Sequence, residues 1–298
     1  MRWEADVSLA PLTRLGVGGP TPRLARPDSE GSLRAVVQSL AGQPFLVLGG
    51  GANTLVSDAG VEVPVLILIG GFDRLELLEG EIRTGAATQI PAFVNQARQA
   101  GRDGFLFLEA VPGTIGGALR MNAGSADTGL WNRALWVEAM TPSGDTLRLT
   151  AAEAKPRYRG VDVPEEWVFL GGVFSAPAGD AEAIRKAHLE RRRQKVETQV
   201  YDLPSCGSTW KNPGPPFGTA WEVVDRVGMR GARRGNALIT EKHANFIANL
   251  GGARAEDVLA LMIETRRRAR DDLGVELEPE IRFWGFTEDE LCAVGATA

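Results

Sequence analysis

Cysteine and histidine are scarce in this chain of 298 residues, which contains two of each. The thiols of Cys206 and Cys292 are too few for a disulfide framework or a four-thiolate metal site. The two histidines, His188 and His243, are likewise too few for a histidine-rich metal centre. We therefore expect a protein that binds no metal ion.

An excess of basic residues is also missing, because the formal net charge is −5 at pH 7. A general nucleic-acid-binding protein normally carries a strong positive charge. The N-terminal segment has no apolar signal sequence, and no apolar run is long enough to cross a bilayer. These absences predict a cytoplasmic protein without nucleic-acid or membrane partners, and we expect it to be a monomer.

The residues that are present alternate between helix-like and strand-like patterns. Apolar residues at helical spacing, with caps and glycine stops, predict helices over residues 28–42, 88–101, 181–197, 219–228 and 255–274. Apolar runs and turn residues predict strands or hairpins over 45–50, 65–70, 74–87, 134–150, 167–177 and 276–286. This mixture indicates an α+β or α/β protein, which we divide into residues 1–72, 73–177 and 178–298.

A glycine-rich loop, Gly49–Thr54, directly follows the first predicted strand. Such loops bind phosphate well because neighbouring backbone N–H groups can converge on an anion, although a simple tight turn remains an alternative. The loop does not match the P-loop pattern, and it departs from G-x-G-x-x-G at Thr54. Residues 52–63 leave little room for a crossover helix, which argues against a dinucleotide-binding βαβ unit.

A second glycine-rich stretch, Pro112–Gly117, lies within residues 104–129, which are rich in small residues and carry little charge. This composition is typical of backbone that packs closely against a bound molecule. Two such loops in one domain could hold the two phosphates of a pyrophosphate, while two unrelated loops remain the alternative.

Five motifs occur in order along the chain: LGGGANTLVSD (48–58), VPGTIGGALRMNAG (111–124), PSCGSTWKNP (204–213), ALITEKHANFIANLGG (237–252) and LEPEIRFWG (277–285). Together they resemble the UDP-N-acetylenolpyruvoylglucosamine reductases, over nearly the whole chain. The length, without a long insertion, resembles the type II branch. The resemblance implies an α+β fold: an FAD-binding domain of the vanillyl-alcohol-oxidase (PCMH) type, with subdomains 1–72 and 73–177, and a smaller α+β substrate-binding domain, 178–298.

The resemblance also implies the cofactors FAD and NADPH. In the implied reaction NADPH reduces FAD, and the flavin passes hydride to the enolpyruvyl ether of UDP-N-acetylglucosamine. The product is UDP-N-acetylmuramate, a peptidoglycan precursor. Because hydride addition leaves an enolate beside a carboxylate, the protein must stabilise negative charge and supply a proton.

Three residues match the family's catalytic positions: Ser208 as the proton donor, Arg159 as the cation beside the carboxylate, and Glu280. The family commonly has Tyr-Arg-x-Ser, whereas this chain has Gly160 and Val161 after Tyr158 and Arg159. Alternation places Glu276 and Glu278 on the same face as Glu280, so the pattern itself does not choose among the three acids.

Binding residues also follow from the resemblance. The expected FAD contacts are Gly49, Gly50, Gly51, Ala52, Asn53, Thr54, Pro112, Gly113, Thr114, Gly116, Gly117 and Asn122. The expected substrate contacts are Lys211, Asn212, Tyr158 and Lys195. The basic group Arg191, Arg192, Arg193 and Lys195 is either a diphosphate-binding patch or a solvated helix face. We expect His243 to cap a turn and Cys206 to be a packing residue.

Two other functions are compatible with parts of the pattern. An FAD enzyme that oxidises a small alcohol or sugar would leave GSTWKNP and LEPEIR without a purpose. A non-catalytic nucleotide-sugar-binding protein is favoured only by the missing serine after Arg159.

Overall fold

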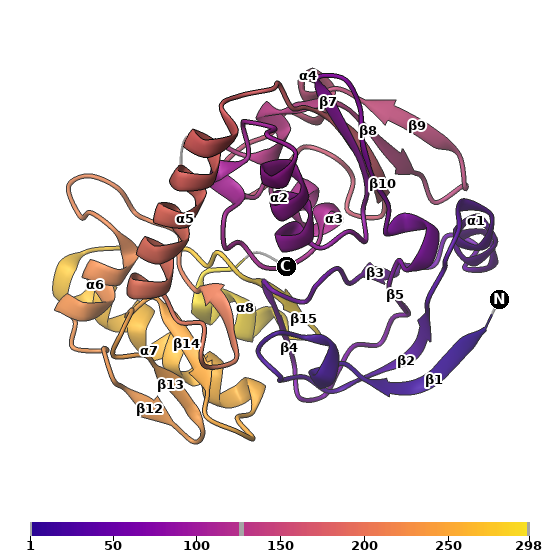
Figure 1. Ribbon diagram of the computed structural model, residues 1–298. Coiled ribbons are helices and arrows are strands. Elements are labelled where there is room, and N and C mark those ends of the chain that lie inside the picture. The colour runs from indigo at the N-terminus through magenta and orange to yellow at the C-terminus, as the bar shows by residue number, and fades with distance from the viewer. Residues whose placement is uncertain (1, 125–127, 297–298) are drawn as a thin grey trace. The chain divides into compact units, whose positions relative to one another are not determined.

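The computed structural model (Figure 1) describes residues 2–124 and 128–296, and its chain divides into two compact units. The first unit comprises Met1–Ala5, Arg23–Gly50 and Val63–Lys195, and the second comprises Asp6–Pro22, Gly51–Glu62 and Val196–Ala298. The chain therefore passes from one unit to the other inside the first glycine loop. The three-part division at residues 72 and 177 stays a prediction.

Two sheets build most of the first unit. One sheet has the order β1 (Trp3–Ser8), β2 (Pro20–Ala25), β5 (Val65–Leu66) and β3 (Leu46–Val47). The other has the order β6 (Leu75–Leu77), β7 (Glu81–Gly85), β10 (Val168–Ser175), β8 (Ala134–Met140) and β9 (Thr146–Leu149). The helices of this unit are α1 (Glu30–Ser39), α2 (Ile90–Gln99), α3 (Ile115–Arg120), α4 (Ala151–Ala154) and most of α5 (Ala181–Thr198).

Strands β3 and β5 come from the two apolar runs predicted as buried strands, and they pair in parallel. Residues 48–64, which connect them and are all described, contain the short strand β4 (Thr54–Val56) and no helix. The expectation that this is not a dinucleotide-binding βαβ unit is confirmed.

Strand β10 contributes side chains to two hydrophobic cores, and register shifts after Phe169 and after Val173 interrupt the simple alternation of its side chains. Phe169 and Phe174 belong to the core that includes the apolar face of α2. Val168 and Leu170 belong to the core that includes the apolar face of α1. In Figure 1, α2 and α3 lie side by side next to β7, β8 and β10. The sheet is therefore covered on both faces.

Local sequence signals set the ends of these elements. The Ser29 hydroxyl accepts a hydrogen bond from the N–H of Ser32 and so caps α1. The two predicted hairpins turn at Gly80 and Gly144, whose φ angles of 71° and 89° favour glycine. Both hairpins are confirmed, as β6–β7 and β8–β9.

The second unit contains a sheet of four strands in the order β11 (Ser205–Ser208), β14 (Phe246–Asn249), β13 (Ala237–Ile239) and β12 (Arg233–Arg234). Its helices are α6 (Ala220–Arg226), α7 (Ala255–Leu273) and α8 (Glu288–Val294). A parallel pair joins β4 to β15 (Arg282–Trp284). Leu15, Val17 and Leu55 are buried in the core of this unit, so its interior is completed by N-terminal segments.

The segment Glu276–Phe286 was predicted as one strand, but only Arg282–Trp284 is regular. Pro279 has no N–H to donate to a sheet, which explains the irregular part before Arg282. The predicted alternation is confirmed, because Leu277 and Ile281 are buried while Glu276 and Glu278 are exposed.

Within residues 2–124 and 128–296, none of the helices combines the length and hydrophobicity that a membrane span requires. Residues 125–127, part of the stretch predicted to pack around a bound molecule, lie outside the described residues.

Candidate active site

The two glycine-rich loops meet in the first unit. A Cβ atom added to Gly49 would lie 2.6 Å from Oγ1 of Thr114, and one added to Gly50 would lie 2.6 Å from Cα of Gly113. Both distances are too short for any side chain, so the close approach of the two loops requires glycine at these positions. The contact favours two cooperating loops over two unrelated ones.

The backbone amides of these loops divide into two groups. The N–H groups of Ile115 and Gly116 donate within the fold, to the carbonyls of Thr88 and Ala86. A second group donates no hydrogen bond to any residue in the described ranges. Four members of this group lie where the two loops approach each other, and they are called the amide cluster below: the amides of Gly49, Gly50, Gly113 and Thr114. Unpaired N–H groups that lie close together can bind an anion such as a phosphate.

Asn122 follows α3 and uses both atoms of its side-chain amide within the fold. Its Nδ2 donates to the carbonyl of Arg157 at 3.2 Å, and its Oδ1 accepts from the N–H of Trp131 at 3.2 Å. Asn122 therefore ties the end of the second glycine loop to the segment that carries Arg159. Its predicted contact with FAD stays a prediction.

Arg159 lies in a tight turn closed by two hydrogen bonds between Arg157 and Gly160, at 2.9 and 3.2 Å. Its φ angle of 58° is unusual for a residue with a side chain, and such backbone strain is frequent at functional sites. The guanidinium carbon lies 4.7 Å from the centre of the Tyr158 ring, and Nη1 donates to the carbonyl of Gly124.

The departure from Tyr-Arg-x-Ser has a structural explanation. Gly160 is buried and closes the turn, and Val161 is 7% exposed within the apolar core of the first unit. The valine thus packs inward, and the turn forms without the serine.

Lys195, a predicted substrate contact, lies on α5 and is partly buried. Burial, together with the positive charges of Arg191 and Arg159, lowers the pKa of Lys195 to about 8, against the opposing negative charge of Glu109. The positive charge of Arg159 therefore acts on Lys195, and the contacts of both residues with substrate stay predictions.

Glu109 is a residue that the sequence patterns did not single out. It is 5% exposed, and its Oε2 lies 2.7 Å from Nδ1 of the buried His188 on α5. The sequence does contain a signal for this residue, because Glu109 is the one charged residue between Gly104 and Leu119. A lone acid in an apolar run that becomes buried needs a partner.

In the second unit, Ser208 ends β11 and is half-buried. Its hydroxyl has no hydrogen-bond partner within the part of the chain that is described, so it is available to a ligand. The next residue, Thr209, donates its N–H to Asn245 at 2.8 Å and accepts from the N–H of Glu280 at 2.8 Å. The structure thus brings Ser208 and Glu280 onto adjacent segments.

Asn53 connects the first glycine loop to the segment that contains Glu280. Its Nδ2 donates to the carbonyl of Glu280 at 3.0 Å, and its own carbonyl accepts from the N–H of Arg282 at 2.8 Å. The residues that follow, in β4 and β15, pair in parallel, so the two segments stay side by side. Loop residues predicted to bind FAD therefore lie beside a predicted catalytic acid.

The three acids Glu276, Glu278 and Glu280 have different partners in the structure. Glu276 forms an ion pair with Arg266 at 2.6 Å, and Glu278 forms one with Lys211 at 3.2 Å. Glu280 is the member of the set whose backbone bonds to both Thr209 and Asn53. This geometry supports the choice of Glu280.

Lys211 and Asn212, both predicted substrate contacts, also have partners within the fold. The N–H of Lys211 donates to the carbonyl of Glu278 at 2.9 Å, and Oδ1 of Asn212 accepts from the N–H of Ala220 at the start of α6. Their contacts with substrate stay predictions.

Two predicted structural roles agree with the observed packing. Nδ1 of His243 accepts from the N–H of Asn245 at 3.3 Å, and the imidazole ring packs edge-on against Phe246, so His243 caps a turn. Cys206 is 1% exposed in the core, and burial raises the pKa of its thiol to about 12, which leaves it inert.

Comparison with known proteins shows which family has a similar sequence and fold. The family profile described as "UDP-N-acetylenolpyruvoylglucosamine reductase, C-terminal domain" matches residues 198–284, and that described as "FAD binding domain" matches residues 21–150. A UDP-N-acetylenolpyruvoylglucosamine reductase of Maricaulis maris (strain MCS10) is 39% identical over 92% of this chain and 89% of its own length.

The chain belongs to the UDP-N-acetylenolpyruvoylglucosamine reductase family. The relative of the same name from Methylorubrum extorquens (strain PA1) is 39% identical over 93% of this chain and 90% of its own length. The crystal structure of the reductase from Thermus caldophilus superimposes with a TM-score of 0.83 at 34% identity, over 95% of this chain and 99% of that one.

Membership of the family confirms the predicted resemblance and the predicted α+β fold with an FAD-binding domain. The chain is accordingly an FAD-dependent oxidoreductase of peptidoglycan precursor synthesis.

Proposed function

We propose that this enzyme uses NADPH, the reductant of its family, to reduce the enolpyruvyl ether of UDP-N-acetylglucosamine to UDP-N-acetylmuramate in the cytoplasm. The observation that carries the proposal is the meeting of three segments: Glu280 donates its N–H to the carbonyl of Thr209, which follows Ser208, and accepts at its carbonyl from Nδ2 of Asn53. Family membership supplies the substrate class, and the amide cluster supplies a place for the cofactor's phosphates.

The residues of the first unit fit an FAD pyrophosphate. Gly49 and Gly50 let the two loops approach each other closely, and the amide cluster provides four unpaired donors. We assign the loop residues Gly49–Thr54 and Pro112–Gly117, with Asn122, to FAD binding. When bound, FAD supplies the hydride for the double bond of the substrate.

Ser208 is assigned as the proton donor to the substrate carbon that becomes an enolate. Its half-buried hydroxyl has no competing partner in the described chain, so its proton can be directed at the substrate. A serine is a weak acid, and a nearby cation is needed to stabilise the alkoxide that remains. Lys211, three residues later in the same motif, is the candidate cation.

Arg159 and Glu280 are assigned to the carboxylate end of the intermediate. A guanidinium offers two parallel N–H donors to a carboxylate and stays charged at every relevant pH. A protonated carboxyl group at Glu280 would add a hydrogen-bond donor there. We further assign Tyr158, Lys195, Lys211 and Asn212 to binding of the UDP-sugar.

The visible spectrum of the purified protein tests the proposal. We expect a flavin spectrum that bleaches with NADPH and recovers, without oxygen, when the enolpyruvyl UDP-sugar is added. A protein that takes up no FAD contradicts the proposal. Recovery with oxygen but not with the UDP-sugar would instead support an oxidase of a small alcohol or sugar.

A further inference from the structure

Glu109 occupies a buried position that apolar residues normally fill. Its side chain is 5% exposed, and it lies three residues before Pro112, where the second glycine loop begins. The loop is held nearby through the N–H of Val111, which donates to Leu108, and the carbonyl of Gly113, which accepts from Ile90. A change in the position of Glu109 would therefore be passed to the loop.

Two side chains of α5 contact the Glu109 carboxylate. Nδ1 of His188 lies 2.7 Å from Oε2, and Nη1 of Arg192 lies 3.8 Å from Oε1. Burial by itself would raise the pKa of Glu109, but the hydrogen bond from His188 and the charges of His188, Arg192 and Arg98 hold it below its usual value. Glu109 is consequently a buried anion that His188 and Arg192 of α5 neutralise by contact, and the charge of Arg98 on α2 acts in the same direction.

The same face of α5 carries the cations of the candidate site. Residues 188, 191, 192 and 195 follow the spacing of neighbours on one helix face. Of the charged groups that act on Lys195, namely Arg191, Arg159 and Glu109, only Glu109 is negative. The carboxylate is thus the counter-ion for a group of cations to which we assign the substrate.

We propose that Glu109 is a positioning residue, whose buried carboxylate fixes α5 against the segment before the second glycine loop and balances the positive charge of the helix face that carries Lys195. This role rests on the proposed function in one respect, that Lys195 and Arg159 bind the anionic substrate. It assigns Glu109 and His188 a task that the family motifs do not include.

The charge of Lys195 can be measured without substrate or flavin chemistry. Acetic anhydride labels only the neutral amine, so the yield at Lys195, read by mass spectrometry across pH 6–10, gives its titration midpoint. We expect a midpoint near pH 8 in the holoenzyme. In Glu109→Gln the neighbouring negative charge is lost, and the midpoint should fall by about one pH unit.

Steady-state kinetics tests the positioning. In Glu109→Gln the KM for the enolpyruvyl UDP-sugar should rise about tenfold near pH 7.5, with kcat changed by less than about twofold. The rise in KM with pH should also begin at a lower pH, because the variant Lys195 loses its proton earlier. Glu109→Asp keeps the negative charge, so the titration midpoint of Lys195 should stay close to that of the wild type. If Glu109→Gln does not fold, the same labelling and kinetics are measured on Glu109→Asp.

Glu190→Gln is the matched control. Glu190 lies on the same helix but is exposed and pairs with Arg193, so its variant should leave both the midpoint and the KM unchanged. Variants of Glu109 that melt at a lower temperature, yet keep the Lys195 midpoint and the KM of the wild type, would overturn the proposal. A wild-type enzyme that does not turn over the UDP-sugar would refute the proposed function instead, while the labelling result would still stand.

Discussion

A main-chain hydrogen bond holds the segment that follows Ser208 against Glu280. Glu280 donates its N–H to the carbonyl of Thr209, the residue after Ser208, and its carbonyl accepts from Asn53. The Ser208 hydroxyl has no hydrogen-bond partner in the described chain, so its removal should change chemistry with little effect on the local fold. This makes Ser208 a good subject for a kinetic variant.

Ser208→Ala should separate the two half-reactions. We expect reduction of bound FAD by NADPH to stay within about twofold of wild type, because no proton from Ser208 is needed there. Turnover of the UDP-sugar should fall by about 10³-fold, within the range typical of a lost general acid. Stopped-flow spectroscopy of each half-reaction checks this, and equal losses in both would contradict the assigned role.

Gly50→Ala tests the contact between the two glycine loops. The added methyl group would lie 2.6 Å from Cα of Gly113, so the loops must separate and the amide cluster must widen. We expect FAD affinity to fall at least about tenfold, measured by titrating the apoprotein with FAD. Gly31→Ala is the control, because a methyl group there meets nothing within 4 Å and lies in α1. Unchanged FAD affinity in Gly50→Ala would argue against the cluster as the phosphate site.

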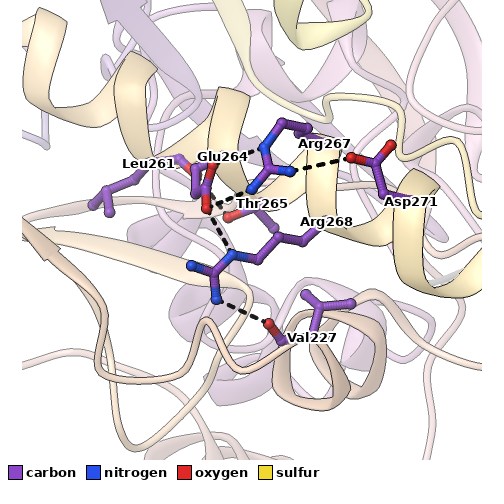
Figure 2. A network of polar contacts seen from close by, with 7 residues as sticks. All are labelled: Val227, Leu261, Glu264, Thr265, Arg267, Arg268 and Asp271. Atoms are coloured by element: carbon purple, nitrogen blue, oxygen red, sulfur yellow. Dashed lines mark hydrogen bonds and ion pairs between the residues drawn. The ribbon is translucent and has the colours of Figure 1, made fainter.

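At the scale of single elements, α7 shows how surface charges support a long helix. Figure 2 shows the carboxylate of Glu264 between two guanidiniums, with Arg267 at 2.9 Å and Arg268 at 2.7 Å. Arg267 also reaches Asp271, and Arg268 reaches the carbonyl of Val227. These bonds, from Arg267 first, lower the pKa of Glu264 to about 2.

The Glu264 network should make stability depend on pH in the acid range. Because the folded pKa is depressed, the contribution is present above the ordinary value of 4.5 and is lost as pH falls toward about 2. The carboxylate is about one-third exposed, so solvent weakens the effect. Glu264→Gln should lower the free energy of unfolding by about 0.5–1 kcal/mol at pH 7 and by almost nothing at pH 2.

Urea unfolding followed by circular dichroism at several pH values measures that difference. Glu166→Gln is the control, because this exposed residue has no polar partner within the described ranges. A loss of stability in Glu264→Gln that is equal at pH 2 and pH 7 would show that the network's charge does not matter.

At the scale of the whole molecule, the second unit is assembled from segments that are distant in sequence. Asp58 accepts hydrogen bonds from the N–H groups of Ala255 and Glu256 and so caps α7 across 197 and 198 positions. Asn249 donates to the carbonyl of Leu15 at 3.0 Å. The C-terminal part of the chain therefore depends on the N-terminal part for its core and its caps.

A fragment of residues 196–298 should accordingly fail to fold cooperatively. It would lack Leu15, Val17 and Leu55 from the core, the strand β4 that pairs with β15, and the cap provided by Asp58. We expect no sharp thermal transition by calorimetry, in contrast to the full chain. A fragment with a cooperative transition near that of the full chain would show that the N-terminal segments contribute little.

The elements of this fold were largely predictable, because their signals are local. Ser29 caps α1, Gly80 and Gly144 turn the hairpins, and the apolar spacing of α2 matches its buried face. The short helix α3 and the strands of the β11–β14 sheet were not predicted. All of these elements are short. The strands are also stabilised by pairing between β11, β13 and β14, which are separated in the chain.

The candidate site was predictable only in part. Motifs identified Ser208, Arg159 and Glu280, but periodicity alone did not separate Glu280 from Glu276 and Glu278. That choice follows from contacts with Thr209 and Asn53, which no local pattern contains. Glu109 escaped notice because its importance lies in burial beside His188, 79 positions away.

By itself the sequence determined the family, the types of local structure and the residues able to carry out the chemistry. Each of these depends on side-chain identity and short-range spacing, which are written directly in the chain. Only the tertiary structure decided which glycines touch, which acid lies beside Ser208, and which buried anion faces the cations of α5. Those relations depend on burial and on hydrogen bonds between distant segments, and both arise only when the chain has folded.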